Sequence, residues 1–226
     1  MKVLDLFCGA GGASDGYHQA GFEVVGVDIK PQPHYPYEFI LADALWFLDQ
    51  LYEWPNLINF DVIHASPPCQ GYSKSVTSKD SKWVNTRGRN EPRLIKPLRE
   101  KFLKLNIPYV IENVTGAHES LISPSLLCGT MFELPIARHR LFETSFAVNQ
   151  PKHPRCRGVA KIYAEINKIE YRDMSITGKG RHTGTSERWS QILGINRMMR
   201  QRDYSEAIPP AYTKYIGEQF RSLNGT

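Results

Sequence analysis

The chain has 226 residues and a mass of 25.8 kDa, so it can bury one substantial core and, beside it, only a small second lobe. Its 28 Lys and Arg against 23 Asp and Glu give a net charge of +5 and an isoelectric point near 9.0, which favours polyanionic partners without identifying one. The sequence has no apolar run near the roughly 18 residues of a membrane span, and its four cysteines form no CxxC pair. We therefore expect a cytoplasmic protein with no membrane segment, no disulfide framework and no metal site.

Apolar runs alternate with helical spacing along the first half of the chain. Strands are predicted at 2–7 (KVLDLF), 23–29 (EVVGVDI), 60–65 (FDVIHA) and 108–114 (PYVIENV), and helices at 13–22, 42–52 and 97–106. This alternation predicts an α/β fold with a doubly wound, mostly parallel sheet covered by helices on both faces. In such sheets ligands bind at the carboxyl ends of the strands.

Two stretches interrupt this pattern. Residues 71–93 are polar and basic with no periodicity, and a connection of that length is typical of a lid or a binding loop. Residues 146–185 are again basic and irregular, before helical spacing returns near 189–199. We therefore predict a main domain of residues 1–145 plus 186–226 and a small inserted basic lobe of residues 146–185.

A glycine-rich turn, FCGAGG, follows the first predicted strand. Its glycines allow backbone N–H groups and a helix N-terminus to approach a ligand, as in nucleotide, dinucleotide and S-adenosylmethionine sites. Asp28 ends the next strand, where a carboxylate can accept hydrogen bonds from ribose hydroxyls, although a turn cap would also explain it. Asp43 is more ambiguous, because Asp is a preferred helix N-cap.

Cys69 lies in the segment ASPPCQGYS, directly after the buried strand predicted at 60–65. Two prolines hold it on a stiff turn at the carboxyl end of the sheet, beside the basic stretch. Reactive cysteines occupy partly exposed, electropositive settings of this kind, whereas structural ones are packed in apolar surroundings. Cys69 is therefore the candidate nucleophile, and Cys128 is assigned to packing.

Three further charged residues are candidates for the same site. Glu112 ends an apolar strand, where a carboxylate is costly unless it has a partner. Arg138 and Arg140 are two residues apart and would share one face of a strand. A salt-bridged strand end for Glu112, and a phosphate patch or a solvated edge for the arginines, remain open as alternatives.

Together these motifs resemble the cytosine-C5 DNA methyltransferases. DLFCGAGG resembles that family's cofactor loop, PPCQGYS its nucleophile loop, ENV its acidic strand and RHRLF its arginine strand, in the family's order. AIPPAYTKYIGEQF resembles its C-terminal motif, so the resemblance covers about residues 1–145 and 186–220. It implies the Rossmann-like fold of the class I S-adenosylmethionine-dependent methyltransferases.

The resemblance also implies a mechanism. Cys69 would attack C6 of a cytosine in DNA, and Glu112 would contact N3 and the exocyclic amine. Arg140 would contact O2, and Arg138 would support the site or a phosphate. C5 would then take the methyl group of S-adenosylmethionine, leaving S-adenosylhomocysteine, with no metal involved. Because a duplex shields C6, the base must be flipped out, and the basic stretch at 73–89 is expected to close over it.

Cofactor contacts are carried over position by position from the same resemblance. They fall around the glycine turn, at the end of the second strand, before the second helix and in the cysteine loop, at Phe7, Gly9, Ala10, Gly11, Asp28, Ile29, Asp43, Ser66 and Pro68. Three positions depart from the family pattern: Ile29 replaces an aromatic residue, Ile136 a glutamine and Glu206 an asparagine.

Size is the most informative departure, because the family's target-recognition domain is usually much larger than the lobe available here. The basic stretch and the lobe offer contacts to DNA at Ser73, Arg87, Arg89, Arg155, Arg157, Lys179 and Arg181. Such a surface grips phosphates but has few elements to read bases, so we expect a short or degenerate recognition site in double-stranded DNA. We expect a monomer of a bacterial or phage-infected cytoplasm, either solitary or part of a restriction–modification pair.

Other functions remain open at this point. A cytosine-C5 methyltransferase of tRNA would carry the same motifs, and a small basic lobe would suit a structured RNA. A catalytically idle DNA-binding regulator is disfavoured by the intact Cys69, Glu112, Arg138 and Arg140. A flavin or NAD oxidoreductase would account for the glycine turn but not for PPCQ.

Overall fold

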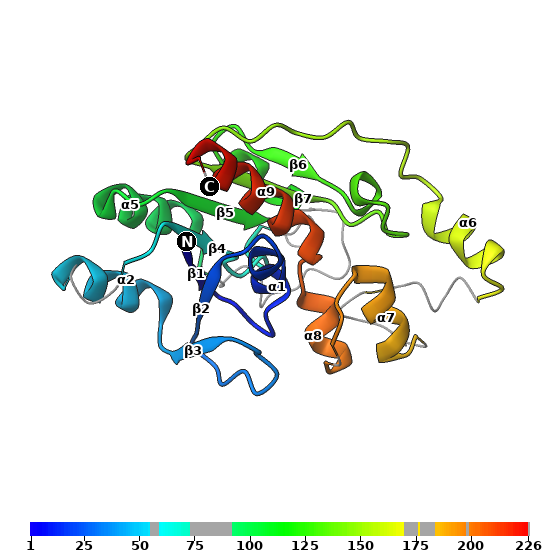
Figure 1. Ribbon diagram of the computed structural model, residues 1–226, viewed down its shortest axis with the longest axis horizontal. Coiled ribbons are helices and arrows are strands. Elements are labelled where there is room, and N and C mark those ends of the chain that lie inside the picture. Colours follow the sequence, from blue (N-terminus) through cyan, green and yellow to red (C-terminus); the bar gives the residue numbers. More distant parts are fainter. Residues whose placement is uncertain (55–58, 73–91, 170–175, 177–183, 198, 226) are drawn as a thin grey trace.

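The computed structural model describes residues 1–54, 59–72, 92–169, 176, 184–197 and 199–225 (Figure 1). Within these residues the chain forms a seven-stranded sheet in the order β3-β2-β1-β4-β5-β7-β6. Strands β3 to β5 of that order run parallel, and β7 is antiparallel to both of its neighbours. The strands are β1 Lys2–Leu6, β2 Glu23–Asp28, β3 Glu38–Leu41, β4 Val62–Ala65, β5 Tyr109–Asn113, β6 Ser125–Leu127 and β7 Arg140–Thr144.

Helices cover both faces of the sheet (Figure 1). The α-helices are α1 Gly12–Gln19, α2 Ala44–Glu53, α5 Ile95–Leu105, α6 Val159–Ile166, α7 Ser186–Leu193, α8 Gln201–Glu206 and α9 Pro210–Leu223, and the 3₁₀ helices are η1 Thr115–Ser120 and η2 Gly129–Phe132. No described helix is long and apolar enough to cross a membrane. The doubly wound, mostly parallel sheet predicted from the sequence is confirmed.

Side chains along each strand alternate between the two faces of the sheet, so each strand contributes to two separate hydrophobic cores. Leu4 and Leu6 of β1 face α2 and α5, whereas Val3 faces α1 and α9. The α1 and α9 face becomes polar toward the carboxyl ends of the strands, where Asp5 and His64 are paired in register and fully buried. The polar end of this face therefore lies beneath the turns that follow β1 and β4.

Helices α1 and α9 approach each other very closely. A Cβ at Gly16 of α1 would lie 2.1 Å from both the carbonyl oxygen of Pro210 and the hydroxyl oxygen of Thr213. The Thr213 hydroxyl donates to the Ala13 carbonyl at 2.7 Å, which closes the contact. The N-terminal strand–helix unit is thus held by the last described helix of the chain.

The strands β3 and β6 were not predicted from the sequence. They have four and three residues, too few for a period to be visible. β7 begins at Arg140, so Arg138 lies in the preceding loop. The expectation that the two arginines share a face of one strand is therefore wrong, although both side chains still reach the same site.

A third hydrophobic cluster lies beside the sheet. It joins Ala164 of α6 to Trp189 of α7 and Tyr204 of α8, with Ile136 packed against it. In Figure 1 α7 and α8 lie side by side, and α6 lies beyond them at the right-hand end of the molecule. The cluster draws on residues from both sides of position 185, and the division into 146–185 and the rest stays a prediction.

Opposite the site, Glu143 of β7 is buried in a network of hydrogen bonds. Arg99 of α5 binds both of its carboxylate oxygens at 2.6 Å, while the Tyr109 hydroxyl and the Ile122 N–H donate at 3.1 and 2.7 Å. Only 2% of the Glu143 side chain is exposed, so its charge depends on these partners.

Replacing Glu143 by Gln should therefore lower the free energy of unfolding by about 3–5 kcal/mol, because the buried Arg99 charge loses its partner. Glu100→Gln, on the same helix as Arg99, breaks an exposed pair with Lys96 and should cost at most about 1 kcal/mol. Urea denaturation of the two variants checks this. Equal losses would contradict the role assigned to Glu143.

Candidate active site

The candidate site is built from segments that leave the carboxyl ends of three adjacent strands. The glycine turn follows β1, the cysteine loop follows β4, and Glu112 and Asn113 end β5. Arg138 and Arg140 reach the same place from the start of the antiparallel strand β7. The predicted ligand edge of the sheet thus gathers residues that are far apart in the sequence.

Left-handed backbone shapes the glycine turn. Gly9 and Gly11 have φ of 50° and 90°, and Phe7 has φ of 60°. The Gly9 N–H donates to Asp28 Oδ2 at 3.1 Å, and the other Asp28 oxygen accepts from Lys30 N–H at 2.9 Å. A Cβ at Gly9 would meet no described atom within 4 Å, so open space borders the turn.

These features fit the cofactor expected there. Asp28 holds the turn, and the adjacent Ile29 leaves 64% of its surface exposed, as an apolar platform for an adenine ring would. Asp43 accepts from Leu45 N–H and Trp46 N–H at 3.0 Å, so it caps α2, and its contact with an adenine amine stays a prediction.

Arg197, which the sequence analysis missed, fastens the glycine turn from the outside. Its guanidinium donates to the Ala10 carbonyl and to the His34 carbonyl, the latter at 2.9 Å. It also lies 3.1 Å from Asp15 in an ion pair. No local pattern marks this residue, because its partners precede it by more than 160 positions in the chain.

The cysteine loop is fixed at both ends. Asn113 of β5 is buried and donates to the Pro67 carbonyl at 3.0 Å. Tyr72 N–H donates to the Cys69 carbonyl at 3.0 Å, and the buried Tyr72 hydroxyl accepts from Ile95 N–H at 3.2 Å. Cys69 is half-buried between these anchors. Asn113 belongs to the ENV motif, and its anchoring role emerges only from the fold.

Glu112 carries a buried carboxylate beside two arginines. Arg140 Nε lies 3.0 Å from Glu112 Oε1. Burial raises the pKa of Glu112, while Arg140, Arg138 and a hydrogen bond from Ser66 oppose that rise. Arg138 donates to the Ser205 carbonyl at 2.8 Å, and burial together with the Arg140 charge lowers its pKa to about 9.

A chain of buried polar groups orients Ser66. Tyr17 lies 3.0 Å from His64 Nδ1, and His64 Nε2 lies 2.8 Å from the Ser66 hydroxyl. Burial lowers the pKa of His64 to about 3, so this histidine is neutral at physiological pH. Ser66 therefore faces Glu112 in this structure, and its expected contact with the cofactor stays a prediction.

The electrostatics of Cys69 follow from the same groups. Burial raises the pKa of the Cys69 thiol, Arg140 lowers it and the Glu112 carboxylate raises it. The thiol is thus protonated in the free protein, and its nucleophilicity depends on the protonation state of Glu112. The fold brings together Cys69, Glu112, Arg138 and Arg140 as one electrostatic unit.

Five of the expected DNA contacts, Ser73, Arg87, Arg89, Lys179 and Arg181, lie outside the described residues. Arg155 and Arg157 are described and exposed, in the segment between β7 and α6.

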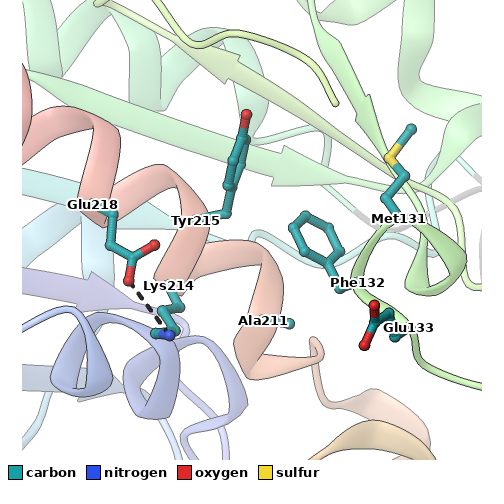
Figure 2. A pocket seen from close by; sticks show the side chains of 7 residues that line it. All are labelled: Met131, Phe132, Glu133, Ala211, Lys214, Tyr215 and Glu218. Atoms are coloured by element: carbon teal, nitrogen blue, oxygen red, sulfur yellow. Dashed lines mark ion pairs between the residues drawn. The ribbon is translucent and has the colours of Figure 1, made fainter. Parts of the chain in front are cut away.

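A separate pocket lies between η2 and α9, where Lys214 and Glu218 form an ion pair at 3.4 Å (Figure 2). None of the candidate site residues lines this pocket.

Known proteins that are similar in sequence to this chain are methyltransferases. Relatives include the type II methyltransferases M.AgeI of Thalassovita gelatinovora (30% identical over 129 residues) and M1.HphI of Haemophilus parahaemolyticus (33% over 128 residues). The matches cover 51% and 50% of this chain but only 28% and 32% of those proteins, so this chain matches about a third of each relative.

The fold also resembles solved methyltransferase structures. The S. pombe Dnmt2 methyltransferase aligns with a TM-score of 0.61 and 13% identity, over 100% of this chain and 99% of that chain. Entamoeba histolytica EhMeth aligns with a TM-score of 0.60 and 13% identity, over 99% of this chain and 98% of that chain. The model of the C-5 cytosine-specific DNA methylases matches residues 1–120 of the 226, which include the glycine turn, Cys69 and Glu112. The chain therefore belongs to the C-5 cytosine-specific DNA methylase family.

Proposed function

We propose that the protein transfers a methyl group from S-adenosylmethionine to C5 of a flipped-out cytosine in double-stranded DNA. The observation that carries this proposal is the half-buried Cys69 thiol facing the ion pair between Glu112 and Arg140. A cysteine, an acid and a guanidinium are the three groups needed to add a nucleophile to a pyrimidine ring that is not reactive on its own.

Cys69 loses its thiol proton to solvent, and the resulting thiolate forms a bond from Sγ to C6 of the cytosine. Glu112 donates a proton to N3. The ring can then accept the electron pair that the attack displaces from the C5–C6 double bond without building up negative charge. Burial favours the protonated form of Glu112, and Arg140 orients the group through its 3.0 Å contact. C5 then carries the electron density that forms the new carbon–carbon bond.

The cofactor supplies the electrophilic methyl group when it is bound. We assign its site to the open space beside Gly9, with Asp28 toward the ribose and Ile29 against the adenine. The final step returns the ring to aromaticity: the C5 proton leaves to a base, the bond from Cys69 to C6 breaks, the thiolate departs and the N3 proton returns to Glu112.

The substrate must leave the base stack, since C6 is shielded in a duplex. We propose that exposed arginines such as Arg155 and Arg157 hold the DNA backbone. The same basic lobe is small, so we propose a short or degenerate recognition site, read with few base contacts.

A trapping experiment tests the proposed chemistry. The protein, S-adenosylmethionine and duplex DNA of mixed sequence containing 5-fluorocytosine should give an adduct that survives denaturation, because fluorine at C5 does not leave as a proton does. Cys69→Ala should give none while still binding the cofactor in calorimetry. An unchanged adduct in that variant would contradict the role of Cys69.

The pH dependence of Cys69 alkylation tests the electrostatics. Glu112→Gln removes a negative charge and should shift the alkylation midpoint to lower pH, whereas Arg140→Gln should shift it to higher pH. Arg155→Gln, at an exposed arginine, should leave it unchanged. Iodoacetamide labelling followed by peptide mass spectrometry gives the midpoint for Cys69 alone.

Glu112→Gln should also lower kcat by about 10²–10⁴-fold.

Competition between acceptors tests the substrate. Duplex DNA should accept radiolabelled methyl groups in preference to an equimolar tRNA mixture, and mapping should reveal a dependence on only a few base pairs. Labelling of tRNA alone would replace DNA by RNA as the substrate, and strict dependence on six or more base pairs, a stringency that several direct base contacts would be needed to supply, would contradict the short recognition site.

A further inference from the structure

Four metal-binding side chains converge away from the candidate active site. One atom each of Cys128, His139, His153 and Cys156 lies within 4.8 Å of all the others. They come from three separate segments: the N-cap of η2, the residue before β7, and the connection from β7 to α6. This cluster, the Cys/His cluster below, holds two of the four cysteines in the chain.

The spacing of the Cys/His cluster is close to that of a tetrahedral site. With zinc–sulfur and zinc–nitrogen bonds of about 2.3 and 2.0 Å, neighbouring ligand atoms lie about 3.3 to 3.8 Å apart. Cys156 Sγ and His139 Nε2 are already 3.5 Å apart. The rings of His139 and His153 meet at 84° with centroids 5.2 Å apart, which suits two imidazoles directed at a common centre rather than a stacked pair.

The chemistry of the donors selects the metal. Two thiols and two imidazoles form a set that zinc binds as a closed structural site. Cys128 is fully buried, and the Thr130 hydroxyl donates to its sulfur at 3.3 Å, as an outer partner of a metal-bound thiolate would. Both cysteines are free thiols in this structure.

We propose that the Cys/His cluster is a structural zinc site that fastens the segment carrying His153 and Cys156 to the edge of the sheet. His139 stands between Arg138 in the loop and Arg140 at the start of β7, so the metal would also fix the junction from which both arginines reach the candidate active site. The expectation of no metal site rested on sequence spacing, in which only His153 and Cys156, separated by two residues, form a short pair.

Zinc content measures this directly and does not depend on methyl transfer. Protein purified without chelator should contain one zinc per chain by plasma mass spectrometry. The double variant His153→Ala/Cys156→Ser should contain none, and since His153 is exposed it should still fold. His118→Ala, at an exposed histidine outside the cluster, and Cys69→Ser should each retain one zinc.

Cobalt substitution reports the geometry. Cobalt in the wild-type protein should give the intense visible absorption of a tetrahedral site with thiolate-to-metal charge transfer, and the double variant should not. Chelation should lower the melting temperature of the wild-type protein and leave that of the double variant unchanged.

Three results would overturn the proposal. One is a wild-type protein that takes up neither zinc nor cobalt. Another is a double variant that keeps its zinc. The third is a disulfide between Cys128 and Cys156 in freshly prepared protein, detected by mass spectrometry without reductant, since such a pair would leave no thiolates for the metal.

Discussion

The structure depends on keeping a carboxylate, Glu112, buried inside the sheet. A buried carboxylate is tolerated only beside cations and hydrogen-bond donors. This requirement explains why an antiparallel strand lies next to β5: β7 starts with Arg140, which reaches Glu112 at 3.0 Å. Arg138 arrives from the loop before it and is held in turn by the Ser205 carbonyl and, through its own carbonyl, by the Tyr212 hydroxyl.

The two faces of β7 carry different groups: one faces the candidate active site and the other faces the core beneath α5. Arg140 and Phe142 face α1 and α9, on the same side as Glu112, whereas Leu141 and Glu143 face the other core. One strand of five residues thus carries an ion pair on each face. The pair on the α5 side is satisfied entirely by protein groups, while the pair on the site side borders the thiol of Cys69.

Much of the site could be predicted because its chemistry lies at the ends of strongly apolar strands. Asp28, Cys69 and Glu112 each follow or end such a run, and the topology of a parallel sheet brings these ends together. Arg197, Asn113 and the Cys/His cluster could not be found in this way, because their partners are set by tertiary packing between segments far apart in the chain. The position of Arg138 could not be predicted either. It lies in the loop before β7 because the strand begins only where it pairs with β5.

The contact between Gly16 and α9 has a consequence for biosynthesis. The ribosome makes α1 roughly two hundred residues before the helix that covers it, and Arg197, which braces the glycine turn, also appears late. The nascent chain therefore carries α1 with its buried face uncovered, and an unbraced glycine turn, for most of its synthesis. Messages truncated before α9 would yield chains with much of the sheet but no closed N-terminal unit, which are natural clients for chaperones and proteases.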